Sequence, residues 1–217
     1  MACAACCAWS AGENETVIDG VASKEALATP PATIPDNAFV VELQKGMAGM
    51  AKGGNQQLGI VLDLADEDLC IVKEIEGGLA AAWNQTCHES QQIKPCDRIV
   101  RVNGVAGSSR DLAAILLAKH DVLSIALVRP EERVVDLAKS TDLGILVKYK
   151  RGSLGFWIDN ITDGEVQKWN LQNPDSAVHP HDRVVAVNGD GGSGAELLAS
   201  MKNKEVLQFK VMHYARS

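Results

Sequence analysis

The feature that most constrains the fold of this chain is a nine-residue motif that occurs twice. The nine residues CDRIVRVNG begin at Cys96, and HDRVVAVNG begins 85 residues later at His181, with six of the nine positions identical. Ile and Val favour strands, and Asn-Gly is a strong signal for a tight turn because both residues tolerate positive φ. Each copy therefore predicts a strand that runs into a tight turn, and the duplication predicts two similar units.

The repeat extends well beyond this nine-residue motif. LGIVL from Leu58 matches LGILV from Leu143, and DVLSIALV from Asp121 matches EVLQFKVM from Glu205. The offset stays at 85, give or take a residue, and the order of the segments never changes. We interpret the chain as a duplication of one unit of about 80–90 residues, the size of a small domain.

Within each copy the patterns predict strand, loop, strand, strand, short helix, strand, turn, helix and strand. The segment SSRDLAAILLAKH predicts the last helix of the first copy, with Ser109 as the N-cap and with Leu112, Ile115 and Leu116 on one face. VLSIALV alternates as a half-buried strand does. Each unit is therefore expected to be α+β and mainly β, a small and partly open β-barrel capped by two helices.

This order of elements resembles a PDZ domain, and the chain contains it twice. In that family a G-L-G-F-like loop opens the second strand, and a G-D-R-I-L-x-V-N-G stretch, which DRIVRVNG matches, forms the fourth strand and its turn. The resemblance implies PDZ-like domains over residues 38–130 and 131–217, after a disordered tail over residues 1–37.

The sequence departs from the family pattern at two places in each copy. Cys96 and His181 replace the glycine before the Asp, and Gln57 and Asp142 replace the first glycine of the loop. The segment SLGF over residues 153–156 looks more like the family loop, but the repeat aligns it with the third strand of the first copy, so we do not assign it to ligand binding.

PDZ domains bind the last residues of a partner chain, which adds a strand to an exposed sheet edge. The resemblance implies a groove between the second strand and the last helix, where backbone N–H groups of the loop receive the terminal carboxylate. The peptide-binding residues that it implies are Leu58, Gly59, Ile60, Val61, Arg110, Ala114 and Leu117 in the first copy, and Leu143, Gly144, Ile145, Leu146, Ala195, Ala199 and Lys202 in the second.

The family selects its ligands partly through the first residue of the last helix, and the matched residues are Arg110 and Ala195. Arg110 is charged at neutral pH, so we expect it to favour Asp or Glu at the third-from-last ligand position, whereas Ala195 gives no such preference. Leu58, Ile60 and Leu117 predict an apolar pocket for the terminal residue, and Lys202 is expected to flank the second pocket.

The resemblance thus implies a non-enzymatic adaptor or scaffold whose partners are the C-terminal peptides or internal strands of other proteins. Two alternatives are a structural subunit of a larger assembly with vestigial grooves and a regulatory fragment associated with a protease. No nucleophile and base cluster in the sequence, so we expect no catalytic residue. The pair His179 and His181 could hold a metal only with ligands from elsewhere, so we expect no metal and no cofactor.

Composition narrows the choice of partners and compartment. The net charge of -7 argues against nucleic acid, and no apolar run reaches the ~18–20 residues of a membrane span. The six cysteines show no pairing that repeats between the copies, so we expect reduced thiols and a cytoplasmic location. Membrane attachment through acylation of Cys3, Cys6 or Cys7 is the less favoured alternative.

Overall fold

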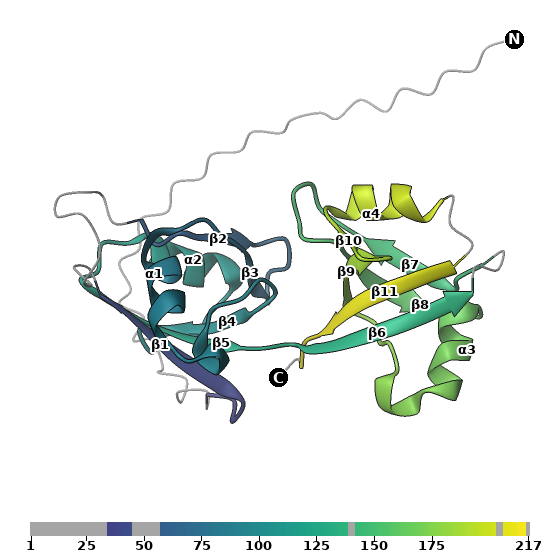
Figure 1. Ribbon diagram of the computed structural model, residues 1–217, viewed down its shortest axis with the longest axis horizontal. Coiled ribbons are helices and arrows are strands. Elements are labelled where there is room, and N and C mark those ends of the chain that lie inside the picture. The colour runs from purple at the N-terminus through teal and green to yellow at the C-terminus, as the bar shows by residue number, and fades with distance from the viewer. Residues whose placement is uncertain (1–33, 45–56, 139–141, 203–205, 216–217) are drawn as a thin grey trace, which may run out of the picture. The chain divides into compact units, whose positions relative to one another are not determined.

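The computed structural model (Figure 1) describes residues 34–44, 57–138, 142–202 and 206–215. Most of the predicted N-terminal tail lies outside these residues. The described residues form two antiparallel sheets, each accompanied by two α-helices. None of the helices in this part of the chain is long and apolar enough to cross a membrane.

The first sheet has the strand order β1-β5-β4-β3-β2. Its elements are β1 (Ala38–Gln44), β2 (Ile60–Asp63), β3 (Cys70–Ile75), α1 (Gly78–Thr86), a 3-10 turn (Glu89–Gln91), β4 (Arg98–Val102), α2 (Ser109–Leu117) and β5 (Val122–Val128). Strands β1 and β2 form the two edges, so the sheet is not closed into a barrel.

The second sheet repeats this plan with the order β6-β11-β9-β8-β7, and β10 pairs with β9. Its elements are β6 (Glu131–Ala138), β7 (Ile145–Lys148), β8 (Phe156–Ile161), α3 (Glu165–Gln172), a 3-10 turn (Pro174–Ser176), β9 (Arg183–Val187), β10 (Asp190–Gly191), α4 (Gly194–Met201) and β11 (Val206–His213). The predicted architecture is confirmed: two partly open units of mixed α+β structure, which we call the first and the second repeat.

Each repeat has its own apolar core. Alternate residues of the strands point inward, among them Val41 and Ile125 in the first repeat and Val135 and Phe209 in the second. Apolar surface removed from water in this way stabilises each repeat at about 25 cal/mol per Å².

The repeated nine-residue motif, which begins at Cys96 and at His181, forms the predicted strand and turn in both copies. Asn103 and Gly104 have φ values of 50° and 78°, and Asn188 and Gly189 have 53° and 86°, as a type I′ turn requires. The Asn103 side chain also accepts a hydrogen bond from the Ser124 amide at 2.9 Å, so it fixes the turn to the last strand of the first repeat.

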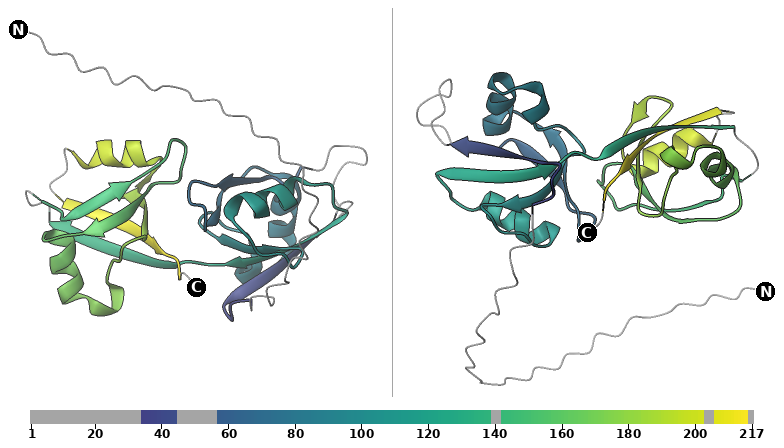
Figure 2. Two further views of the ribbon diagram at one scale, coloured as in Figure 1. Left: turned by 180° about the vertical axis from the view of Figure 1, so that it is seen from behind. Right: turned by 90° about the horizontal axis from the view of Figure 1, so that it is seen from below.

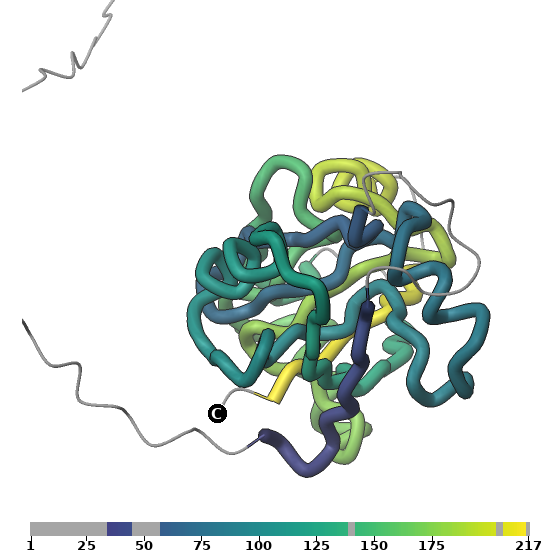
Figure 3. The backbone as a smooth tube through the Cα atoms, turned by 90° about the vertical axis from the view of Figure 1, so that its left-hand side faces the viewer, coloured from purple at the N-terminus to yellow at the C-terminus, as the bar shows by residue number. Residues whose placement is uncertain are grey.

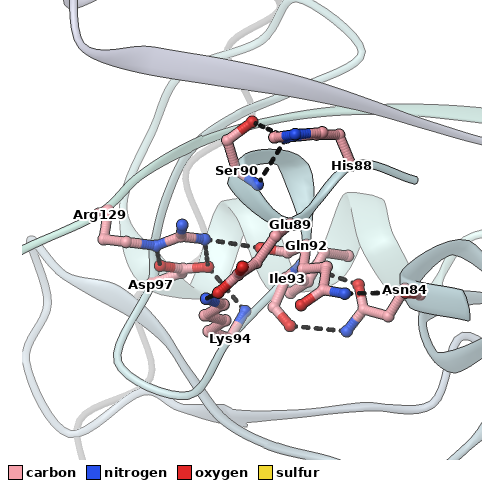
Figure 4. Close-up of polar contacts among 9 residues, drawn as sticks. All are labelled: Asn84, His88, Glu89, Ser90, Gln92, Ile93, Lys94, Asp97 and Arg129. Carbon is pink, nitrogen blue, oxygen red and sulfur yellow. Dashed lines mark hydrogen bonds and ion pairs between the residues drawn. The ribbon is translucent and has the colours of Figure 1, made fainter.

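A buried carboxylate precedes the fourth strand of each repeat. Asp97 accepts hydrogen bonds from the Lys94 amide at 2.7 Å and from the Arg129 guanidinium at 3.0 and 3.1 Å (Figure 4). The residues before the two carboxylates, Cys96 and His181, have φ values of 74° and 73°. The backbone therefore adopts the left-handed conformation at both positions although a side chain is present.

We expect His181→Gly to stabilise the protein by up to about 1 kcal/mol, because glycine adopts the left-handed conformation without the strain that a side chain adds. Equilibrium denaturation by guanidinium chloride measures the change. The matched control is His88→Gly, where φ is -66° and where glycine should destabilise instead. An equal effect of both substitutions would show that the backbone at His181 is not strained.

The last helix of the first repeat begins one residue earlier than the sequence predicts. Its N-cap is Ser108, not Ser109, and the Ser108 side chain accepts a hydrogen bond from the Asp111 amide while the Asp111 carboxylate accepts one from the Ser108 amide. The Ser108 hydroxyl also donates to the Asp111 carboxylate. This bond, followed by the smaller effect of the bond from the Ser108 amide, lowers the pKa of Asp111. Ser193 and Glu196 form the same capping box in α4.

An apolar cluster joins residues of both repeats. Leu69, Ile71 and Cys96 of the first repeat pack with Val185, Met212 and Tyr214 of the second, and the Tyr214 hydroxyl donates to the Cys96 carbonyl at 3.0 Å. Beside this cluster the guanidinium of Arg183 binds the carboxylate of Asp63, and both side chains are buried. Asp63 also accepts a hydrogen bond from the Leu154 amide at 2.8 Å.

Removal of one member of the buried pair should be costly, because it leaves the other charge without compensation. We expect Asp63→Ala to lower the free energy of unfolding by about 3–5 kcal/mol, and the double variant Asp63→Leu/Arg183→Met to recover most of that loss. The comparison is Lys148→Ala, which breaks the more exposed Lys148–Asp159 pair and should cost about 1 kcal/mol or less. A loss below about 1 kcal/mol for Asp63→Ala would contradict this assignment.

Candidate functional site: a groove between an edge strand and a helix

The loop that opens β2 is fastened to the first turn of α1. The carbonyls of Gln57 and Leu58 accept hydrogen bonds from the amides of Leu79 and Ala80, at 3.1 and 3.0 Å. The N-terminal amides of a helix have no partner within the helix, so the loop supplies the acceptors that these donors need. The loop carbonyls therefore point toward α1.

Gly59 is required at the crossing of the loop and the helix. Its φ is +73°, and a Cβ atom there would overlap the carbonyl oxygen of Gly77. Only glycine allows two backbone segments to approach so closely. This accounts for the leucine-glycine pair that both copies contain at this position.

An apolar groove with a volume of about 720 Å³ lies beside the edge strand β2. Helix α2 forms its other wall, and the two elements lie side by side in Figure 1 and in the view from behind in Figure 2. The base includes Leu43, Leu79 and Leu123, and Lys119 and His120 line it just beyond the C-terminal end of α2. Strand β1, drawn in purple at the front of Figure 3, forms the opposite edge of the sheet.

The structure brings five of the seven predicted residues of the first repeat to this groove: Leu58, Gly59, Ile60, Val61 and Leu117. Arg110 and Ala114 are exposed and are not among the residues that line it; Ala113 and Leu116 line it instead. The shift follows from the start of the helix at Ser109. The preference that we expect from Arg110 stays a prediction.

The capping box is the signal that would have placed the helix correctly. A Ser followed three residues later by an acidic residue marks a helix start, and Ser108 and Asp111 satisfy this spacing, whereas Ser109 is followed by Leu112.

The predicted residues of the second repeat show the same displacement on the helix. On the strand side, Leu143 and Ile145 pack against the core, Gly144 is buried and Leu146 is exposed. On the helix side, the predicted residues Ala195, Ala199 and Lys202 are all exposed, while Leu198 and Met201 pack against the core.

The loop of the second repeat contains a carboxylate that the first lacks. The Gly144 amide donates a hydrogen bond to the Asp142 carboxylate at 2.8 Å, and the Leu143 carbonyl accepts one from the Val166 amide at 3.1 Å. At the position of Asp142 the first repeat has the neutral side chain of Gln57. A negative charge thus lies against an N–H group of the second loop only.

Tyr149 distinguishes the second repeat further. A Cβ atom on Gly194 would lie 2.5 Å from the Cβ atom of Tyr149, so the tyrosine packs against the first turn of α4. The equivalent residue of the first repeat is Leu64, which lines the groove. The second repeat therefore has an aromatic side chain between the end of β7 and the start of α4.

The segment SLGF takes part in the third strand of the second repeat, as the repeat predicts. Phe156 begins β8, and Gly155 has a φ of +62° with its Cα against the carbonyl of Val184 in β9. This glycine permits a close strand approach and does not open the second strand.

Two buried thiols of the first repeat, one in its core and one in the cluster that joins the repeats, are poor nucleophiles. Burial raises the pKa of Cys70 to about 12 and the pKa of Cys96 to about 11. Because the thiolate is the reactive form, both side chains act as small apolar groups at neutral pH.

No family model matches the chain, and no curated protein matches it. Among solved structures, the chain is similar to INAD PDZ45 in complex with an NG2 peptide, with 17% identity over 87% of this chain and 97% of that chain and a TM-score of 0.34. It is also similar to the complex of INAD PDZ45 with NORPA CC-PBM, with 15% identity over 86% and 99% of the two chains and a TM-score of 0.33. The Dlg1 PDZ2 domain of the choanoflagellate Monosiga brevicollis matches 39% of this chain and 100% of its own, with 18% identity and a TM-score of 0.32.

Proposed function

We propose that this chain is a non-enzymatic adaptor of two PDZ-like domains, residues 38–130 and 131–217, and that the first binds the C-terminal peptides of partner proteins. The observation that supports this most strongly is the apolar groove between the edge strand β2 and helix α2. A peptide in an extended conformation would pair with β2 and complete its unpaired edge.

The proposed ligand ends in an apolar residue. Leu58, Ile60 and Leu116 give the groove an apolar wall on each side, and burial of a Val, Leu or Ile side chain is worth about 1.5–3 kcal/mol. The carbonyls of the loop that opens β2 bind α1. We therefore assign the N–H groups of this loop as the donors to the terminal carboxylate. Lys119, which also lines the groove, would add a favourable charge.

We propose that the second repeat does not bind a free carboxylate, because Asp142 already accepts a hydrogen bond from the Gly144 amide. A ligand carboxylate there would meet a like charge. The alternative function, a structural subunit with vestigial grooves, is favoured by the same carboxylate and by the buried contacts between the repeats.

The first test measures fluorescence anisotropy of peptides with apolar C-terminal residues and free or amidated ends. We expect binding to the free ends, loss on amidation, and about tenfold weaker binding to Leu117→Asp, which corresponds to about 1.4 kcal/mol. Leu117 is exposed at the rim of the groove, so the added carboxylate should repel the ligand without unfolding the protein.

The matched control for this test is Ala114→Asp, which adds the same charge to an exposed residue of α2 outside the groove lining and should bind like the parent. Equal binding of amidated peptides would refute recognition of the carboxylate. No binding to any peptide, together with stable co-purification in a large assembly, would support the structural subunit.

The second test replaces Asp142 with the glutamine of the first repeat. We expect Asp142→Gln to raise the stoichiometry from one peptide to two in calorimetric titration, because the loop amide of Gly144 is released. Asp142→Asn removes the charge but can keep the hydrogen bond, so it separates the two effects. Asp175→Asn removes an acid from an exposed turn of the same repeat and should change nothing. A stoichiometry of one in both Asp142 variants would show that another feature closes the second repeat.

A further inference from the structure

We propose that His179, Asp182 and His213 form a binding site for a zinc ion in the second repeat. His179 and Asp182 lie in the turn before β9, and His213 ends β11. The donor atoms of the three side chains all lie within 4.8 Å of one another. Two imidazoles and a carboxylate are ligands that zinc prefers in sites that keep a position open for water.

The distances are close to those that the metal needs. The Asp182 carboxylate is 2.6 Å from Nδ1 of His213 and 4.0 Å from Nδ1 of His179. Bonds of about 2.0–2.1 Å in a tetrahedral arrangement separate the ligand atoms by about 3.3 Å. The first gap must therefore open and the second must close, each by less than about 1 Å, and the two imidazole nitrogens, which lie within 4.8 Å of each other, must come to the same separation.

The backbone holds the ligands in place before any ion binds. Asp182 is buried and accepts a hydrogen bond from the His179 amide at 2.9 Å. His213 is paired with Glu131 across β11 and β6. Directly opposed residues of antiparallel strands have side chains close together, so Glu131 is a second carboxylate within reach of the site.

Arg133 is the positive charge that an ion must accommodate. Its guanidinium binds the Ala177 carbonyl and the Glu131 carboxylate and lies 3.3 Å from Nδ1 of His179. Arginine donates only, so the Nδ1 atom of His179 accepts from Arg133 and its lone pair faces that guanidinium, which also lies 3.9 Å from the Asp182 carboxylate. An ion must therefore displace this nitrogen of Arg133 from Nδ1 of His179. Two carboxylates against one arginine leave a net negative charge while the histidines are neutral, which favours a cation.

Zinc would bind the lone pair of Nδ1 on His213, with the ring proton on Nε2. The hydrogen bond between His213 and Asp182 would then be replaced by two bonds to the metal, and Arg133 would keep its contacts with Ala177 and Glu131. Arg183 follows Asp182 in the chain, Tyr214 follows His213, and both contact the first repeat. The ion would therefore also help to hold the residues that join the two repeats.

The experiment uses the full chain with Cys3, Cys6 and Cys7 replaced by Ser, so that these thiols do not compete. Cobalt(II) is titrated, its visible absorption is recorded, and zinc is then added to displace it. We expect one cobalt per chain without a thiolate charge-transfer band. His179→Gln and His213→Gln should each weaken binding by more than the ~10–100-fold that loss of an outer-shell partner costs.

His181→Asn is the matched control, because it removes an exposed histidine of the same turn that does not belong to the cluster, and its affinity should equal that of the parent. The side chain of His179 is 53% exposed, so His179→Gln decides the matter even where His213→Gln fails to fold. The proposal is overturned by the absence of a cobalt spectrum in the parent, by unchanged affinity in His179→Gln, or by a thiolate band.

Discussion

The attachment of a loop to the start of a helix positions the second strand of both repeats. In the first repeat the carbonyls of Gln57 and Leu58 bind the first amides of α1, and in the second the carbonyl of Leu143 binds the amide of Val166 in α3. Gly59 and Gly144 make this approach possible, since each has a positive φ and no room for a side chain. The attachment fixes where the second strand begins, and this strand forms the edge that a ligand would extend. A change at Gly59 would therefore move the wall of the groove as well as disturb the contact of the loop with α1.

In the first repeat the edge strand is held at both ends. The loop at its start binds α1, and Asp63 at its end binds Arg183 of the second repeat. Burial of this ion pair is costly unless both partners are present and hydrogen-bonded, and Asp63 meets that condition with a further bond from Leu154. The second repeat therefore helps to hold the edge strand of the first repeat in place, even if it binds no peptide itself. This gives a physical reason for keeping the second repeat although its loop contains the carboxylate of Asp142.

Much of the fold could be predicted from the sequence because its signals are local. The Asn-Gly turns and the alternating strands depend on neighbouring residues, and the offset of the repeat placed the SLGF segment correctly. The start of α2 was wrong by one residue because two serines compete for the N-cap, and only the partner Asp111 decides between them. Because of this shift of one residue, Ala113 lines the groove where the sequence predicts Ala114. The pairs Asp63–Arg183 and His179–His213 could not be predicted, because no local pattern connects residues so distant in the sequence.

The two buried carboxylates show how the copies have diverged around a shared framework. Each receives an amide hydrogen bond from the turn before the fourth strand, from Lys94 in the first repeat and from His179 in the second. Asp97 is then bound by two nitrogens of Arg129, whose charge is permanent and whose N–H groups cannot bind a metal. Asp182 instead contacts His213, and imidazole can exchange a proton for a metal ion. The carboxylate of the first repeat is thus fixed in a structural role, whereas the equivalent carboxylate of the second repeat lies beside the two histidines of the proposed zinc site.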